Sequence, residues 1–336
     1  MFDHFVFSKF SFLLRAKDIL MLPQYKGSTL RGGFGNAFKK VVCTIRNSIC
    51  DECLLKAKCI YSYIFETPPP EGSEILRKYE KAPHPFVIEP PLETKMHYKP
   101  DETLTFNLIL IGKAVDYLPY FIYTLEELGR IGIGKGRGKY ELKEVCCDEK
   151  QIYNSVDRQL KQVKNNSPSI PSYFKRGKEE LPPLYNGGLR GVTQKYSLIT
   201  LNFITPARII VNEDLVVDLE FHHLIRGLLR RITTLSYFHH GKRIEIDFKG
   251  FIERASKVKA KERNTKWYDW ERYSARQDTK MKMGGFIGMV TFEGDLNEFL
   301  PFIRIGEIIH VGKGTSFGLG KYEIMEGEPK SHFSGI

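Results

Sequence analysis

The sequence predicts an α+β protein built from two tandem domains. Its 336 residues fit two domains of ordinary size. Two glycine-rich segments, 132–142 and 312–324, share one design, in which glycines and basic residues precede Gly-Lys-Tyr-Glu and an apolar residue. They begin 180 residues apart, so each ends one half of the chain. Self-similarity at this spacing indicates two related domains.

The first half follows the order strand, helix, two strands, helix, strand. We expect strands over 5–16, 86–88, 103–112 and 140–147, and helices over 28–42 and 118–129. In the first helix Leu30, Phe34 and Val41 recur at helical spacing, and Ser28 is a candidate N-cap. This order is typical of the ferredoxin-like β-α-β-β-α-β fold, which we assign to residues 1–147.

The second half repeats the alternation after a polar, turn-rich connection over 148–193. We expect strands over 196–204 and 286–292, helices over 220–238 and 296–303, and then the second glycine segment. Residues 194–336 therefore form the second predicted domain, again of the ferredoxin-like type.

Positive charge is concentrated in the second half. The formal net charge is +11, and residues 226–276 hold fourteen Lys/Arg against six Asp/Glu, so they carry +8 of it. Such a field is typical of nucleic-acid binders, and the aromatic residues among these charges suit stacking on unpaired bases. The alternative is a solvated basic face without a partner. The predicted RNA contacts here are Arg226, Arg230, Arg231, Arg272 and Arg276.

The second glycine loop is a candidate cradle for a polyphosphate backbone. Successive N–H groups in glycine-rich turns form anion-binding concavities, and two lysines add charge. The alternative is a hairpin that packs tightly and binds nothing. The predicted RNA contacts in it are Gly312, Lys313, Gly314, Thr315, Ser316, Gly318, Gly320 and Lys321. Lys26 and Arg31 join them, because the N-terminus of the 28–42 helix also favours an anion.

Four cysteines form an insertion after the first helix. Cys43, Cys50, Cys53 and Cys59 are spaced C-x6-C-x2-C-x5-C. In a cytosolic protein this favours a metal over disulfides, and four thiolates suit a structural Zn²⁺. An iron–sulfur cluster and free buried thiols are the alternatives.

No segment predicts a membrane anchor. The apolar stretch over 5–22 is interrupted by Lys9, Arg15, Lys17 and Asp18. We therefore expect a soluble, cytoplasmic protein that does not act at a membrane.

The motifs together resemble a known family. They comprise residues 22–35 leading into the four cysteines, 129–134, 203–208, 270–277, 284–285 and the glycine loop 312–320. Spread over nearly the whole chain, they are similar to those of the CRISPR-associated endoribonuclease that processes precursor CRISPR RNA, a member of the repeat-associated mysterious protein (RAMP) superfamily.

The resemblance implies two RNA-recognition-motif-like domains that bind CRISPR repeat RNA along a basic cleft and the glycine loop. It implies cleavage without a metal cofactor, in which a ribose 2′-OH attacks the neighbouring phosphate and leaves a 2′,3′-cyclic phosphate. This chemistry needs a base, an acid and a cation. The family's base is a histidine in the first helix, where this chain has Asn36 instead, and asparagine accepts no proton near neutral pH.

We predict that position 36 is the general-base site, with Tyr25, Lys39 and Lys40 as its partners. Three explanations of Asn36 stay open: a weak or inactive member, a deliberate His→Asn substitution, or a base elsewhere. Candidates for the last are His222, His223, His239 and His240.

Two rival functions remain at this stage. The first is a non-catalytic RNA-binding subunit of a CRISPR effector complex, which needs no base and works with other subunits. The second is an unrelated zinc-containing nucleic-acid binder.

Overall fold

The computed structural model describes residues 2–45, 49–69, 81–161, 196–274 and 279–325, without the side chains of 271–274 and 279–282. The chain forms two compact units. The first comprises Met1–Ile170, Thr233–Ile244 and Thr315–Gly318, and the second comprises Pro171–Ile232, Glu245–Gly314 and Leu319–Ile336. The tip of the second glycine loop therefore belongs to the first unit.

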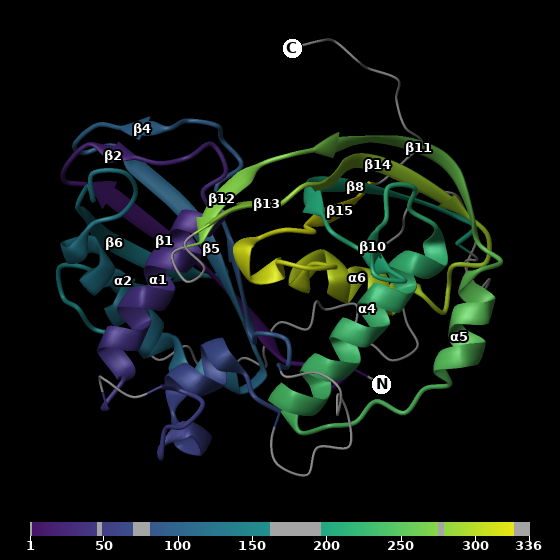
Figure 1. The fold of residues 1–336 in the computed structure, drawn as a ribbon, viewed down its shortest axis with the longest axis horizontal. Coiled ribbons are helices and arrows are strands. Elements are labelled where there is room, and N and C mark those ends of the chain that lie inside the picture. Colours follow the sequence, from purple (N-terminus) through teal and green to yellow (C-terminus); the bar gives the residue numbers. More distant parts are fainter. Residues whose placement is uncertain (1, 46–48, 70–80, 162–195, 275–278, 326–336) are drawn as a thin grey trace. The chain divides into compact units, whose positions relative to one another are not determined.

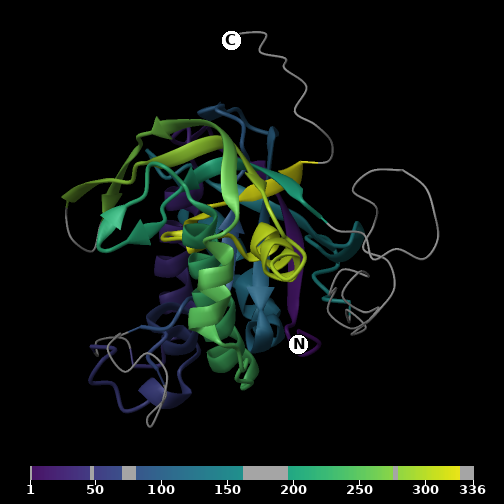
Figure 2. The ribbon, with the colours of Figure 1, turned by 90° about the vertical axis from the view of Figure 1, so that its right-hand side faces the viewer.

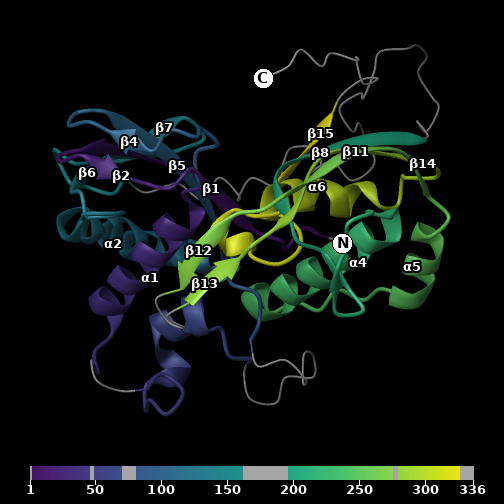
Figure 3. The same ribbon diagram turned by 45° about the horizontal axis from the view of Figure 1, so that its top comes forward.

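The first unit has the predicted ferredoxin-like order, with extensions. Its elements are β1 (Phe7–Ala16), β2 (Leu20–Met21), α1 (Gly27–Val42), η1 (Lys56–Lys58), η2 (Ser62–Glu66), β3 (Phe86–Glu89), β4 (His97–Tyr98), β5 (Thr103–Ile111), η3 (Gly112–Tyr117), α2 (Leu118–Ile131), β6 (Tyr140–Cys147) and β7 (Lys150–Asn154). The main sheet is antiparallel with strand order β3-β5-β1-β6-β7, and α1 and α2 cover one face of it (Figures 1 and 3).

The core of this unit lies between the helices and the sheet. Along β1 every second side chain faces the helices, so that Phe10, Phe12 and Leu14 are buried. From α1, Leu30, Phe34, Ala37 and Phe38 meet them, as their helical spacing predicts. The helix begins at Gly27 without a side-chain cap, so the prediction of Ser28 as N-cap was wrong.

The second unit repeats the same topology. Its elements are β8 (Leu198–Ala207), β9 (Ile210–Val211), β10 (Asp214–Leu215), α4 (Phe221–Leu235), η4 (Ser236–His240), α5 (Phe248–Ala255), β11 (Lys259–Tyr268), β12 (Glu271–Ser274), β13 (Thr279–Lys282), β14 (Gly285–Glu293), α6 (Leu300–Ile309), η5 (Thr315–Phe317) and β15 (Tyr322–Met325), of which η4, η5 and the last turn of α4 fall in the first unit. The antiparallel sheet has strand order β11-β14-β8-β15, and α4 and α6 lie on one face of it (Figure 2). The predicted fold class, two tandem ferredoxin-like domains, is therefore confirmed.

The first glycine segment connects α2 to β6, and the second connects α6 to β15. In both segments the shared tyrosine hydrogen-bonds to the preceding helix. Tyr140 donates its hydroxyl to the carbonyl oxygen of Leu125 in α2 at 2.8 Å. Tyr322 does the same to Ile303 in α6 at 2.5 Å. The tyrosine of the repeated Gly-Lys-Tyr-Glu sequence thus hydrogen-bonds β6 to α2 and β15 to α6.

Three elements differ from the sequence prediction. Strand β11 was not predicted, since it is an edge strand whose side chains are mostly exposed and therefore lack an alternating pattern. Helix α6 begins at Leu300, four residues after the predicted start at 296. Residues 150–154 of the predicted connection form β7, which pairs with β6, and residues 162–193 of that connection lie outside the described residues.

Candidate RNA-binding and catalytic site

Helix α1 presents two different sides to its surroundings. Arg31, Gly35 and Lys39 are four residues apart and share one side. The Arg31 guanidinium lies 5.0 Å from the ring centre of Phe65, and Lys39 Nζ lies 5.5 Å from that of Tyr61. A methyl group on Gly35 would stand 3.0 Å from Phe65, so glycine there lets the aromatic insertion approach the helix. This side therefore packs on the segment that follows α1.

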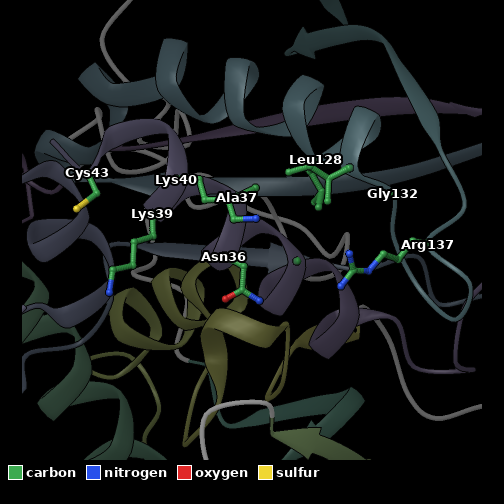
Figure 4. Close-up of a pocket in the computed structure, with 10 residues that line it drawn as sticks. Asn36, Ala37, Lys39, Lys40, Cys43, Leu128, Gly132 and Arg137 are labelled. Carbon is green, nitrogen blue, oxygen red and sulfur yellow. The ribbon is translucent and has the colours of Figure 1, made fainter. Parts of the chain in front are cut away.

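The adjoining side of α1, which also includes Lys39, lines a groove of about 660 Å³, together with the end of α2 and the first glycine loop. Asn36, Lys39 and Lys40, three of the predicted catalytic residues, all line it. Arg137 from the first glycine loop lines it too, and its guanidinium points toward Asn36 (Figure 4). Among the described residues that line this groove, three are cations and none is a carboxylate. Such a surface favours phosphate groups.

Arg137 was not predicted as a site residue. It is exposed, and its backbone has a positive φ of 52°. The loop is bent by Gly132 and Gly134, at which a methyl group would overlap the carbonyl oxygens of Arg137 and Met21 respectively. The glycine-and-arginine repeat in the sequence was the available signal for this residue.

Tyr25 and Lys26, just before α1, are engaged inside the first unit. Tyr25 donates its hydroxyl to the carbonyl oxygen of Phe317 at 2.8 Å. Lys26 is fully buried, and its ammonium donates to the carbonyl oxygens of Gln24 at 3.2 Å and Glu93 at 2.7 Å. Burial lowers the pKa of Lys26, against a smaller opposing effect of Glu93. The burial of Lys26 does not favour an RNA contact there, and its role, like the catalytic role of Tyr25, stays a prediction.

The second glycine loop is a packed turn. Thr315 and Ser316 are buried, and a methyl group on Gly320 would overlap the carbonyl oxygen of Val311. Several backbone amides of the loop form internal hydrogen bonds. Those that donate to carbonyl oxygens of the protein are the N–H groups of Lys313, Gly318, Leu319 and Gly320. This packing does not favour RNA contacts at Thr315, Ser316, Gly318 and Gly320, which stay predictions. Gly312, the exposed Lys313, Gly314 and Lys321 stay predicted contacts.

The basic residues of α4 divide into exposed and buried ones. Arg226 and Arg230 are exposed. Arg231 is buried and donates its Nε–H to the carbonyl oxygen of Ile309 at 3.0 Å. Burial lowers the pKa of Arg231 to about 9. This burial does not favour an RNA contact at Arg231, which stays a prediction, as do the exposed Arg226 and Arg230. Arg276 and the side chain of Arg272 lie outside the described residues.

The cysteine insertion does not assemble a metal site in the part of the chain that the structure describes. No three or more His, Cys, Asp or Glu side chains there are placed to hold a metal ion. Cys43 lines the α1 groove, whereas Cys53 and Cys59 line a separate cavity with His239. Zinc therefore gains no support from the described residues, and the four-thiolate site stays a prediction.

Of the four histidines proposed as alternative bases, the two at the end of α4 have structural partners. His239 is buried between the Tyr63 hydroxyl at 3.1 Å from Nδ1 and the Pro83 carbonyl at 2.8 Å from Nε2. His240 accepts the N–H of Val6 at Nε2 at 2.8 Å. Burial lowers the pKa of His240. His222 and His223 lie at the start of α4, where burial again lowers the pKa of each.

Sequence analysis overlooked His84, whose Nε2 lies 3.3 Å from Nη2 of Arg31 on α1.

Comparison with known proteins gives matches in both halves. Residues 5–166 match a family model described as an N-terminal domain, and residues 201–322 match the model of the CRISPR-associated endoribonuclease Cas6. An uncharacterized curated protein of Archaeoglobus fulgidus is 30% identical over 149 residues, which are 42% of this chain and 49% of that protein. The match thus spans about half the length of that relative.

Solved structures share the fold. A Cas6 product complex gives a TM-score of 0.54 at 14% identity, with 95% of this chain and 100% of that chain covered. A Cas6 of Thermus thermophilus gives 0.50 at 14% identity, with 96% and 99% covered. A partial Cas6-RT-Cas1–Cas2 complex gives 0.54 at 12% identity, with 98% and 47% covered. At these identities the likeness shows the fold alone.

The tandem ferredoxin-like fold is shared with solved Cas6 structures, and residues 201–322 match the model of the Cas6 endoribonuclease family. These matches support the resemblance stated from the sequence motifs. Among the described helices, none combines the length and the apolar character that crossing a membrane requires.

Proposed function

We propose that this chain is an endoribonuclease that binds CRISPR repeat RNA and cleaves precursor transcripts without a catalytic metal. The ribose 2′-OH attacks the neighbouring phosphate, and the products carry a 2′,3′-cyclic phosphate and a 5′-OH. The observation that carries this proposal is the match of residues 201–322 to the Cas6 endoribonuclease family. The Cas6 product complex with the same fold supports it.

The α1 groove is the proposed phosphate-binding part of the site. Lys39, Lys40 and Arg137 line it together with Asn36. Three cations around one groove neutralise successive phosphates of an RNA strand. The Asn36 amide offers two donors and one acceptor to a phosphate or a ribose hydroxyl, but it takes up no proton. RNA thus lies along the exposed side of α1 in this proposal, with Lys39 and Lys40 stabilising the charge that develops on the phosphate.

Asn36 is the proposed general-base position, with Tyr25 as its partner. Asn36→His therefore restores an imidazole at this position, and we expect the cleavage rate to rise by about 10²-fold or more. Single-turnover cleavage of repeat RNA measures the change, with Asn36→Gln as a matched variant that gains no titratable group. An unchanged rate in Asn36→His would remove position 36 from the catalytic assignment.

A non-catalytic RNA-binding subunit of a CRISPR effector complex is the second candidate. The specific observation in its favour is Asn36, an amide in a helix where the family places a base. Such a subunit shares the fold and the basic groove and assembles with other CRISPR proteins. We place either function in the cytoplasm.

One incubation separates the two candidates. The protein is mixed with a radiolabelled CRISPR repeat RNA from the same genome in excess EDTA, and binding and product ends are analysed together. Cleavage to fragments with 2′,3′-cyclic phosphate ends supports the endoribonuclease. Tight binding without cleavage supports the subunit and contradicts the enzyme.

A further inference from the structure

His84 lies between Thr67 and Arg31. Thr67 donates its hydroxyl to the carbonyl oxygen of Ala82 at 2.8 Å, and its Oγ1 lies 3.5 Å from His84 Nδ1. On the other side, His84 Nε2 lies 3.3 Å from Arg31 Nη2. Because a guanidinium can only donate, we assign the lone pair to Nε2, the ring nitrogen that faces α1.

Arg31 is held rigidly beside this nitrogen. Its guanidinium lies 5.0 Å from the ring centre of Phe65 and 4.9 Å from that of Phe317. The two aromatic contacts hold the guanidinium plane between the rings. Phe317 is itself fixed, because its carbonyl oxygen accepts the Tyr25 hydroxyl. An imidazole base and an oriented cation thus stand together at one point of the α1 surface.

The other described imidazoles of the first unit are placed differently. The ring nitrogens of His239 and His240 contact the Tyr63 hydroxyl and backbone carbonyl oxygens, not a cation. His4 Nε2 pairs with Ser236 Oγ at 2.6 Å. His97 is exposed on β4. His84, which is partly exposed, is the histidine of this group that contacts a cation of α1.

We propose that His84 is the general base of the cleavage and that Arg31 binds the scissile phosphate. When RNA binds, the Nη2–H group of Arg31 donates its hydrogen bond to a non-bridging phosphate oxygen instead of to His84. The Nε2 lone pair of His84 is then free to accept a proton. Nε2 then takes the proton of the ribose 2′-OH, the 2′-oxygen bonds to phosphorus, and the bond from phosphorus to the 5′-oxygen breaks. The departing 5′-oxygen takes a proton from water, and the imidazolium returns its proton to solvent. This inference rests on the proposed function and places the base of the native chain at His84 instead of position 36, because the Asn36 amide takes up no proton.

Single-turnover cleavage of repeat RNA in EDTA tests the role of His84. We expect His84→Ala to slow cleavage by at least about 100-fold while RNA affinity changes by less than about twofold. The matched control is His97→Ala, which should cleave at the wild-type rate. His84→Gln is a second variant that keeps a polar side chain but no proton acceptor of suitable basicity, in case the alanine variant does not fold. Wild-type rates in a folded His84 variant would overturn the proposal.

A readout independent of cleavage separates this inference from the proposed function. Repeat RNA with a 2′-deoxy sugar at the scissile position is added to the full chain labelled with ¹³C at its imidazoles. We expect the His84 resonance to shift on binding and that of His97 to stay unchanged. If the wild-type protein binds the 2′-deoxy RNA but does not cleave unmodified repeat RNA, the proposed endoribonuclease function is contradicted, and with it a base role for His84. Cleavage by the wild type with an unmoved His84 resonance contradicts the inference alone.

Discussion

The two glycine loops occupy equivalent places along the chain, the first between α2 and β6 and the second between α6 and β15, yet they present different atoms to solvent. The first loop exposes the side chains of Lys135, Arg137 and Lys139. The second buries Thr315 and Ser316 and commits several of its amides to internal hydrogen bonds. Both segments hold four glycines, and the second adds the hydroxyl groups of Thr315 and Ser316, but it is the first loop that borders the cationic groove.

The two loops also differ in what surrounds their glycines. In the second loop the space is filled by the protein, because a methyl group on Gly318 would stand 2.5 Å from Cδ of Pro90 and 2.7 Å from the carbonyl oxygen of Ile88. In the first loop a methyl group on Gly136 would meet only the end of the Met21 side chain, at 3.2 Å. Glycine content alone therefore does not identify an anion site; the exposure of the neighbouring cations does.

The largest expected effect tests whether the second loop is a packing element. Gly27 of α1 has no room for a side chain, since a methyl group there would overlap the carbonyl oxygen of Phe317. We expect Gly27→Ala to lower the free energy of unfolding by about 3 kcal/mol, as overpacking against backbone does. Urea unfolding measures the change.

Gly32, in the same helix, provides the matched control. A methyl group there meets nothing within 4 Å. Gly32→Ala should therefore raise the free energy of unfolding by about 0.5–1 kcal/mol. Equal effects of the two substitutions would mean that Phe317 does not pack against Gly27.

An intermediate effect concerns RNA binding by the two loops. We expect Arg137→Ala to weaken repeat-RNA binding several-fold and to reduce the salt dependence of log K by roughly one unit of slope, because one phosphate contact is lost. Ser316→Ala should leave both quantities unchanged, since the Ser316 side chain is buried. Binding titrations over a range of salt concentrations compare the two variants. An equal loss of RNA affinity in Arg137→Ala and Ser316→Ala would contradict the claim that the first loop, and not the second, contacts RNA.

The smallest effect tests the feature that both loops share. Tyr140→Phe and Tyr322→Phe each remove one buried hydrogen bond to a helix carbonyl. Each should lower the free energy of unfolding by about 1 kcal/mol. Tyr120→Phe, at an exposed tyrosine of α2, should change it by less than about 0.5 kcal/mol. Unequal costs at Tyr140 and Tyr322 would show that the repeated motif serves different purposes in the two units.

Much of the fold followed from periodicity. The apolar spacing of Leu30, Phe34 and Phe38 predicted α1, and the echo of the glycine segments predicted the tandem domains. Edge strand β11 was missed because neither of its faces is buried, so hydrophobic alternation was absent.

The site was harder to predict because its chemistry depends on distant partners. Lys26 is buried against the carbonyl of Glu93, and Arg231 against that of Ile309, so their burial cannot be seen from local sequence. His84 meets Arg31 across 53 residues of chain. Local pattern identified Asn36, Lys39 and Lys40 as a group, because residues three and four apart on one helix necessarily lie near one another.

Crosslinking of repeat RNA to the protein tests most directly whether α1 and the first glycine loop hold the strand. RNA carrying 4-thiouridine beside the scissile phosphate is bound, irradiated and digested, and the crosslinked peptides are identified by mass spectrometry. We predict crosslinks in residues 31–43 and 132–139. Crosslinks confined to residues 312–321, with none in α1, would contradict this placement of the RNA.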